Sequence, residues 1–357
     1  MFDSFGEQLR LTVTQSVRLL KQTPYSAAAL ARIAAHGKKA ASERARHLEE
    51  GVQVPPILIL STTAACNLNC AGCYSRQTAH MPGTDLPPDA IHRLVDEAAE
   101  IGVAVLMLAG GEPLLAPEWL HAAARHPGLL TLLFTNGTLL DDARARWLAE
   151  HRHILPVFSL EGTEVHTDLR RGEGVHAAVQ EAILRLTRYS VPFGVSITTT
   201  AENLEFVTSP AFLEENFLSA CRLFLYVEYV PAAPNTLHLV LDKQQKQQLT
   251  EHCRANGKRY PALFLPFPGD EALHDGCLAA GRGFVYMSPS GDLQPCPFAP
   301  FSDRNISGTS LLTALRSPLL RRIRAQHHTL REGVGGCALR SNADWVAQAL
   351  EEKGVDN

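Results

Sequence analysis

The chain has 357 residues, of which 45% are hydrophobic and 20% are charged, and its formal net charge is −4. This composition is that of an ordinary folded protein with a large core, and it excludes a disordered chain. The negative charge argues against a nucleic-acid partner, because such proteins rely on a basic surface. No stretch approaches the roughly 18 uninterrupted apolar residues that a membrane-spanning helix needs.

The cellular compartment decides how the eight cysteines are interpreted. The first residues, Met1 to Glu7, lack a basic stretch followed by an apolar one. No secretion signal is therefore expected, and the protein is predicted to be cytoplasmic. Cysteines in the cytoplasm stay reduced, so these eight are expected to be free thiols or metal ligands.

Residues 1–54 form the first of three predicted domains. Apolar residues recur with helical spacing on both sides of Pro24, which predicts two helices. Eight Lys and Arg residues face five acidic ones here, so the segment is locally basic. We expect the helices to pack on the side or bottom of the main domain. Contact with an anionic membrane surface is the alternative.

Residues 55–240, the second predicted domain, alternate short apolar runs with amphipathic stretches. The expected strands are 57–60, 103–108, 130–134, 154–159, 193–198 and 223–230. The expected helices are 88–101, 116–125, 141–152, 174–189 and 209–220. Such repetition predicts an α/β fold, a partial (β/α)6 TIM-like barrel with a parallel sheet. The chemistry of such folds sits at the carboxyl ends of the strands.

A cysteine motif follows the first predicted strand. Residues 66–74 read C-N-L-N-C-A-G-C-Y, which places Cys66, Cys70 and Cys73 on one short loop. Three thiolates aimed at one point suit a soft metal. A tetrahedral zinc site would want a fourth Cys or His close by. A [4Fe-4S] cluster normally has four cysteine ligands, so three leave one iron free for a non-protein ligand.

The spacing C-x3-C-x2-C, followed by the aromatic Tyr74, resembles the signature of the radical S-adenosylmethionine (SAM) superfamily. The resemblance implies that these cysteines bind a [4Fe-4S] cluster whose free iron is chelated by SAM. A three-cysteine zinc site with a distant fourth ligand is the alternative. The resemblance covers about residues 55–340, and it is not specific for a substrate.

The second strand ends in the sequence Gly110-Gly111-Glu112-Pro113. Two glycines let a backbone approach a ligand closely, and a carboxylate can accept from an ammonium group. The stretch resembles the family's G-G-E-P element, which binds the amine of SAM. An ordinary Gly-Gly turn is the alternative.

The next strand ends resemble family positions near the ribose and carboxylate of SAM. These residues are Thr135, Asn136, Ser159 and Glu161, the last at a position where Asp is commoner. Residues 166–172, H-T-D-L-R-R-G, resemble an H-D-x-x-R-G element with one residue inserted. Either Arg170 or Arg171 would then face SAM, and Arg171 is favoured because it precedes the glycine.

Polar residues on the fifth and sixth strands indicate a wet ligand cavity. Ser196 and Thr198 alternate on the fifth strand and are predicted to contact SAM. Tyr226 and Glu228 share one face of the sixth. A carboxylate in an apolar strand must be paired, protonated or functional. Both residues are therefore predicted to be catalytic, with a structural ion pair of Glu228 as the alternative.

Residues 241–357, the third predicted domain, form a small extension. The pattern predicts a β-hairpin of residues 284–287 and 292–294. Cys277 and Cys296 flank this hairpin and become neighbours, and Cys337 follows a helix expected near residues 310–325.

The extension resembles the auxiliary-cluster regions called SPASM and twitch domains, because Gly291 and Cys296 match their G-x4-C element. The resemblance implies a second, auxiliary [4Fe-4S] cluster on Cys277, Cys296 and Cys337. Its fourth ligand is not evident. Cys253 is a candidate, and a set of structural thiols without a metal is the alternative.

The resemblance as a whole implies an enzyme that cleaves SAM reductively to a 5′-deoxyadenosyl radical, which abstracts a hydrogen atom from a substrate. A flavodoxin- or ferredoxin-type protein is the expected electron donor. A small molecule, cofactor precursor or lipid is the first substrate hypothesis. The alternatives are a peptide-modifying maturase and a non-catalytic iron-sulfur protein that binds no SAM.

Overall fold

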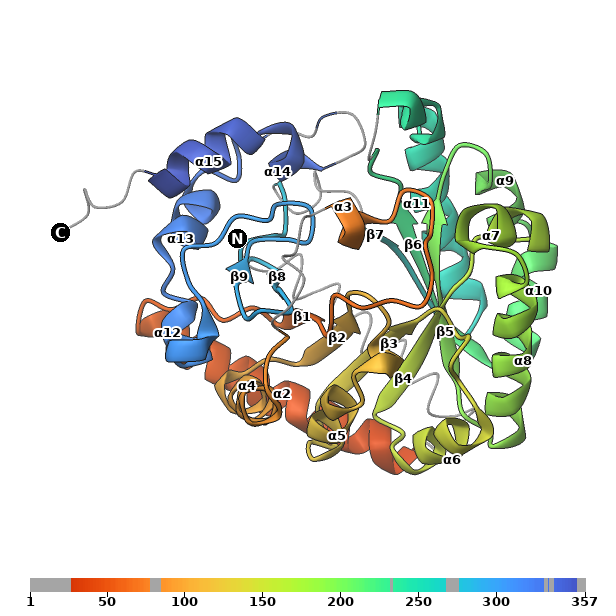
Figure 1. Ribbon diagram of the computed structural model, residues 1–357, viewed down its shortest axis with the longest axis horizontal. Coiled ribbons are helices and arrows are strands. Elements are labelled where there is room, and N and C mark those ends of the chain that lie inside the picture. Colours follow the sequence, from red (N-terminus) through yellow and green to blue (C-terminus); the bar gives the residue numbers. More distant parts are fainter. Residues whose placement is uncertain are drawn as a thin grey trace.

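The strands of the fold form one sheet (Figure 1). The computed structural model describes residues 27–77, 85–231, 234–267, 276–330, 333 and 337–351. Within them, nine strands lie in the order β7-β6-β5-β4-β3-β2-β1-β8-β9. Neighbouring strands are parallel except for the antiparallel pair β8 and β9. The strands are Ile57–Ser61, Val105–Ala109, Leu130–Thr135, Ile154–Ser159, Phe193–Thr199, Cys221–Glu228, Leu263–Phe267, Phe284–Met287 and Leu293–Gln294.

The six strands expected from the sequence are β1 to β6, and they form the predicted partial barrel. The sheet is open, because β7 and β9 lie at its two edges. Helices cover its outer side along the lower and right parts of Figure 1. They are α2 (Ala27–Glu49), α4 (Pro88–Ile101), α5 (Glu118–Ala124), α6 (Asp142–Glu150), α7 (Glu164–Arg171), α8 (Val175–Arg188), α9 (Leu204–Val207), α10 (Pro210–Leu218) and α11 (Lys243–Arg259).

Helix α4 illustrates how local sequence sets these elements. Pro88 occupies the first turn, where its missing N–H costs nothing. Gly102 ends the helix in the left-handed conformation, with φ of 110°, and donates to Ala98 O. Between them Leu94 and Val95 are buried against the sheet. The predicted bounds 88–101 are therefore confirmed.

Two groups of apolar side chains divide the sheet into an outer and an inner face. The larger group fills the space between sheet and helices and includes Leu106 and Leu108. The smaller one lies inside the barrel around Leu132, Val157 and Leu223. Successive strand residues point to opposite faces. Odd-numbered residues of β6 therefore face the interior, and even-numbered ones face the helices.

Helix α2 packs below the barrel, where strands begin. His36 Nε2 lies 2.9 Å from Val103 O, and Arg44 Nη1 donates to Gly102 O at 2.6 Å. Both carbonyls precede β2, at the end of the sheet away from the carboxyl termini of the strands. This supports the packing role expected for the N-terminal segment. The first of its two predicted helices lies outside the described residues.

The C-terminal part extends the same sheet at both edges. The predicted hairpin is present as β8 and β9, and β8 pairs in parallel with β1. Strand β7 was not among the expected strands. It contains Pro266, and an edge strand tolerates proline because one side needs no hydrogen bonds. The division after residue 240 stays a prediction, and strands from both sides of it share one sheet.

The helix expected near residues 310–325 is two helices. They are α12 (Leu311–Ala314) and α13 (Pro318–Ala325). Pro318 cannot continue a helix, and Ser317 accepts a hydrogen bond from Leu320 N at 3.0 Å as the cap of the second one. Two further helices, α14 (Ala338–Ser341) and α15 (Ala343–Glu351), follow at the left of Figure 1.

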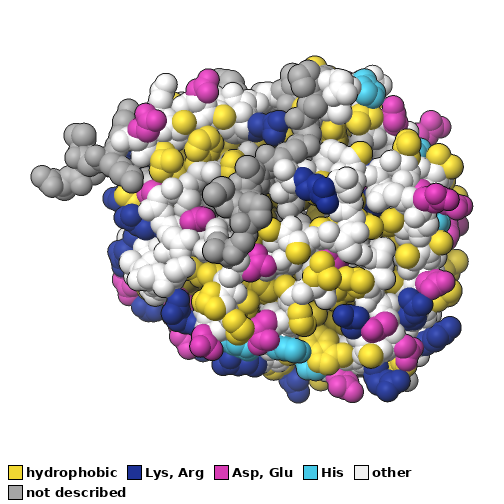
Figure 2. Space-filling view, viewed as in Figure 1, with side chains coloured by type: hydrophobic (Ala, Val, Ile, Leu, Met, Phe, Trp, Pro, Cys, Tyr) yellow, Lys and Arg dark blue, Asp and Glu magenta, His cyan; other side chains and the backbone are white. Residues whose placement is uncertain are grey.

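The charged side chains on the surface and the hydropathy of the helices agree with what the composition predicts. On the face shown in Figure 2, Lys and Arg side chains alternate with Asp and Glu around the lower rim. Among the described helices, none combines the length and the apolar character that crossing a membrane requires.

Candidate functional site

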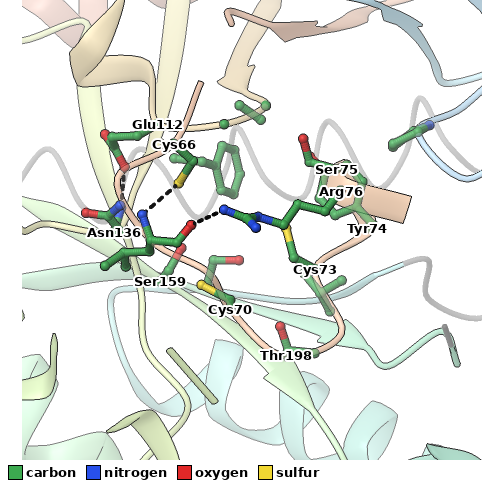
Figure 3. A pocket seen from close by; sticks show the side chains of 18 of the residues that line it. Cys66, Cys70, Cys73, Tyr74, Ser75, Arg76, Glu112, Asn136, Ser159 and Thr198 are labelled. Carbon is green, nitrogen blue, oxygen red and sulfur yellow. Dashed lines mark hydrogen bonds between the residues drawn. The ribbon is translucent and has the colours of Figure 1, made fainter. Parts of the chain in front are cut away.

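A cavity of about 240 Å³ opens at the carboxyl ends of the barrel strands. Figure 3 shows the side chains of Cys66, Cys70 and Cys73 pointing toward its central space. Nine other predicted residues also line it, namely Tyr74, Gly110, Gly111, Glu112, Asn136, Ser159, Arg171, Ser196 and Thr198. The fold therefore brings together residues from β1 to β5 that are up to 132 positions apart, from Cys66 to Thr198.

The cysteine loop between β1 and α3 (Tyr74–Gln77) is fixed by its neighbours. Leu68 N donates to Cys66 Sγ at 3.5 Å, and Ala71 N donates to Arg170 O at 2.8 Å. A Cβ added at Gly72 would stand 3.0 Å from the hydroxyl of Tyr229. Tyr229 follows β6 and was not singled out from the sequence. Its odd-numbered position, shared with the cavity-lining Leu225 and Val227, is the signal that could have found it.

The donor set of this loop fits an iron-sulfur cluster. Burial raises the pKa of the Cys66 thiol, and nearby Glu112, Cys70 and Cys73 add to that rise. A cationic group beside this thiol would favour its thiolate form. No three described Cys, His, Asp or Glu side chains are close enough to hold one metal ion. Cluster ligands stand farther apart, because each cysteine binds a different iron.

Glu112 lies at the bottom of the cavity with only 1% of its surface exposed. Its Oε1 accepts from Leu114 N at 3.0 Å and from Thr135 Oγ1 at 2.8 Å. Its Oε2 accepts from Asn136 N at 2.9 Å. Burial raises the pKa of this carboxyl, although these donors act in the opposite direction. A cationic ligand group would stabilise its ionised form.

Two residues predicted to contact SAM act below the cavity surface instead. Thr135 holds Glu112, as described above. Pro113 begins the short 3₁₀ helix η2 (Pro113–Leu115) and is buried outside the cavity lining. Gly111 belongs to the lining, and a Cβ there would stand 1.9 Å from Ala65 O. This close approach presses the end of β2 against the cysteine loop.

Glu161 is a third residue that lies away from the cavity wall. Its Oε1 accepts from Arg170 Nη1 at 2.6 Å and from Arg171 Nε at 2.8 Å, and its Oε2 accepts from Thr198 N at 2.9 Å. Burial alone would raise the pKa of Glu161, but the two guanidinium groups lower it overall. Arg170 and Arg171 both line the cavity, so the structure does not select one of them.

The prediction that Tyr226 and Glu228 face the cavity is wrong. Both are even-numbered residues of β6 and lie on its helix-facing side, whereas Leu225 and Val227 line the cavity. The Tyr226 hydroxyl donates to Val207 O at 3.2 Å. Glu228 pairs with Lys246 Nζ on α11 at 2.9 Å. The structural ion pair, which was the alternative for Glu228, is therefore what the structure contains.

Cys277 and Cys337 both interact with Cys296, which ends the predicted hairpin. The thiols of Cys296 and Cys337 share a hydrogen bond, which lowers the pKa of Cys337 and raises that of Cys296. Cys277 is close enough to raise the pKa of Cys296 as well. Cys253, the candidate fourth ligand, is buried on α11 among core residues near Tyr226. That position gives no support to a ligand role.

An aromatic pair joins the two groups of cysteines. The rings of Tyr74 and Phe298 lie with their centroids 5.5 Å apart. Tyr74 follows Cys73 directly, and Phe298 N donates to Cys296 Sγ at 3.2 Å. Phe298 and Pro297 also line the cavity, although neither was predicted as a site residue. Cys296 is therefore followed directly by two residues of the cavity that Cys66, Cys70 and Cys73 also line.

Comparisons with known proteins agree with this geometry. The model of the Radical SAM superfamily matches residues 60–205. An AdoMet-dependent heme synthase of Methanosarcina barkeri is 30% identical, over 71% of this chain and 79% of the relative. The mycofactocin maturase MftC of Mycobacterium ulcerans is 27% identical, over 77% of this chain and 79% of the relative.

Solved structures share the fold. SuiB of Streptococcus suis bound to S-adenosylmethionine superposes with a TM-score of 0.65 at 16% identity, covering 88% of this chain and 79% of SuiB. The cofactors of the family, a [4Fe-4S] cluster and SAM, suit the thiols, glycines and buried carboxylate described above. The chain therefore belongs to the radical SAM superfamily.

Proposed function

We propose that the protein is an enzyme that cleaves SAM reductively and abstracts a hydrogen atom from a small cofactor precursor. The observation that carries the proposal is the shared cavity, in which three thiols, two glycines and a buried carboxylate meet an apolar wall. When bound, the [4Fe-4S] cluster supplies the electron that divides SAM into methionine and a 5′-deoxyadenosyl radical. A flavodoxin- or ferredoxin-type donor belongs to the same proposal.

The residues of this chain position SAM and exclude water. Glu112 would accept a hydrogen bond from the SAM ammonium, and Gly110 and Gly111 let the ligand lie against the backbone. Arg170 or Arg171 would face the SAM carboxylate. The apolar side chains at the wall keep water from the reacting atoms; they are Ile59, Met107, Phe134, Leu225, Val227, Phe267 and Phe298.

An iron tetrapyrrole is the substrate class to test first. The first support is the 30% identity to a protein named as a heme synthase. The second is the chemistry of the cavity. A tetrapyrrole is a flat apolar ring with carboxylates, so the ring would contact the apolar wall of the cavity and the carboxylates would pair with the cavity's arginines. Arg76 lines the cavity and donates to the backbone oxygen of Leu68 at 2.9 Å. Because this acceptor is neutral, the positive charge of Arg76 is available to an anionic ligand.

A peptide substrate is the second candidate. Its support is the 27% identity to a protein named as a maturase. A peptide would need to thread its backbone past the cysteine loop, whereas a tetrapyrrole would be held by charges at its rim. The two candidates therefore differ in what the arginine Arg76 contributes to binding.

Product analysis under strictly anaerobic conditions tests the proposal. Reconstituted and reduced protein is incubated with SAM, and 5′-deoxyadenosine is measured by liquid chromatography and mass spectrometry. We expect its formation to rise on addition of an iron coproporphyrin and not on addition of a peptide. Stimulation by a peptide alone would replace the first candidate with the second. Absence of 5′-deoxyadenosine under every condition would contradict the proposal itself.

Glu112→Gln should weaken SAM binding about 10- to 100-fold, because a hydrogen bond to a charged group contributes about 1.5–3 kcal/mol and each 1.4 kcal/mol is about tenfold. The ammonium of SAM needs the ionised carboxylate. Since burial raises the pKa of Glu112, wild-type affinity should fall as the pH falls through that raised value. The Gln variant should lack this pH dependence.

Equilibrium dialysis of SAM against the reconstituted protein at several pH values measures both effects. Glu118→Gln is the matched control, because Glu118 lies on the outside of α5 and pairs with His92. It should bind SAM as the wild type does. Equal affinity of the Glu112→Gln variant and the wild type would show that this carboxylate does not contact the amine.

A further inference from the structure

We propose that Glu161, Arg170 and Arg171 form a buried charge group that sets the reduction potential of the cluster on Cys66, Cys70 and Cys73. The inference rests on the proposed function, because it assigns these residues a task toward that cluster. This task is additional to the contact with the SAM carboxylate that is proposed for Arg170 or Arg171.

The group carries a net positive charge. Two guanidinium groups share one carboxylate, through Arg170 Nη1 at 2.6 Å and Arg171 Nη2 at 2.5 Å from Glu161 Oε1. Exposed fractions of 2% for Glu161 and 10% for the Arg171 side chain keep water from screening these charges. Interactions between buried charges are screened far less than those at the surface.

The positive charge lies next to the cysteine loop. Arg171 Nη1 donates to Cys70 Sγ at 4.0 Å, the length of a weak hydrogen bond to sulfur. The sulfurs of Cys70 and Cys73 are close enough to Arg170 to raise its pKa. The loop cannot drift away, because Ala71 N donates to Arg170 O at 2.8 Å. Glu112 is the other carboxylate that interacts with Arg171.

The second arginine is what makes the charge positive. A single arginine paired with Glu161 would give a neutral pair. The H-D-x-x-R-G element, which residues 166–172 resemble, contains one arginine. The inserted residue places Arg170 and Arg171 together in the last turn of α7, where cations also complement the helix dipole. Within the group of Glu161, Arg170 and Arg171, one positive charge therefore remains after Glu161 is neutralised.

The sign of the effect follows from charge. One-electron reduction adds a negative charge to the cluster, the electron coming from dithionite in the titration below. Nearby positive charge and hydrogen bonds to the sulfurs stabilise the reduced form and raise the potential. Removing Arg171 should therefore lower the potential, and removing the charge of Glu161 should raise it. A role in folding alone would not produce opposite shifts.

A dithionite titration followed by electron paramagnetic resonance tests the proposal on the reconstituted full chain. The first cluster is identified as the signal that a Cys66/Cys70/Cys73→Ala variant lacks. At a fixed poise, Arg171→Gln should lower the ratio of reduced to oxidised cluster about tenfold, about 59 mV for a one-electron couple. Glu161→Gln should raise the ratio. Arg185→Gln is the control, because Arg185 pairs with Glu181 on the outer helix α8 and should change nothing.

Unchanged potentials, or shifts of the same sign in both variants, would overturn the proposal. Should Arg171→Gln fail to assemble the cluster, Arg171→Lys keeps the charge and should hold the potential near the wild-type value, while a fall as large as that expected for Gln would contradict the charge argument. The response of the signal to added SAM is recorded separately. A wild-type signal that does not change when SAM is added would refute the proposed function. The potentials of the Arg171→Gln and Glu161→Gln variants would still test the proposed effect of the charge group on the cluster.

Discussion

Replacing Cys66, Cys70 and Cys73 together by Ala is expected to remove about four of about eight irons per chain, by the four-iron stoichiometry of each cluster. The same variant should form no 5′-deoxyadenosine, since no other described cysteine lines the cavity beside Gly110 to Glu112. Iron and sulfide analysis with Mössbauer spectra of anaerobically reconstituted protein measures the first effect. Product analysis measures the second.

A control separates loss of ligands from loss of folding. Cys221 and Cys253 are buried core thiols outside both cysteine groups. Changing both to Ala should leave the iron content unchanged. A fall from about four irons to none in the triple variant would make Cys277, Cys296 and Cys337 structural thiols, by the same stoichiometry. The prediction of an auxiliary [4Fe-4S] cluster would then be wrong.

Gly111→Ala is expected to disrupt the site through one methyl group. The added Cβ would stand 1.9 Å from Ala65 O, while Gly111 N donates to Thr63 O at 2.8 Å. Neither backbone segment can yield without moving Cys66. Overpacking of this kind costs about 1–3 kcal/mol of stability. We expect that loss together with depleted iron at the first cluster and SAM binding weakened beyond detection by equilibrium dialysis.

Gly37→Ala provides the matched control. Gly37 lies in α2, and a Cβ there meets nothing within 4 Å. Replacing a glycine in a helix interior by alanine should stabilise the protein by about 0.5–1 kcal/mol. Urea unfolding measures both changes. A Gly111→Ala protein with full iron content and wild-type affinity for SAM would show that the backbone contact with Ala65 is not required.

The sequence was sufficient for the site residues that follow strands directly. The runs of apolar residues fixed β1 to β5 within about two residues, and every parallel strand ends at the same side of the sheet. Cys66, Gly110 and Asn136 therefore had to meet once the strands were known. Similarly, a hairpin between Cys277 and Cys296 had to bring its two ends together.

The sequence was insufficient where a side chain could face either way. Strand β6 is apolar on both faces, because one covers the barrel interior and the other packs on helices, so its pattern does not distinguish Tyr226 from Leu225. Only the register with β5 and β7 decides. Glu161 is similar: nothing in the chain predicts that both arginines of α7 turn back onto it.

Local sequence therefore determined strands β1 to β5, the cysteine loop and the family, because these depend on contacts between residues near one another in the chain. Only the tertiary structure decided that β8 pairs with β1 and that Phe298 packs against Tyr74. It also decided that Arg171 contacts Cys70, which lies 101 positions earlier in the chain. Such contacts join segments that the chain brings together only after the sheet has formed. Their partners are selected by packing and charge in three dimensions, which a one-dimensional pattern does not contain.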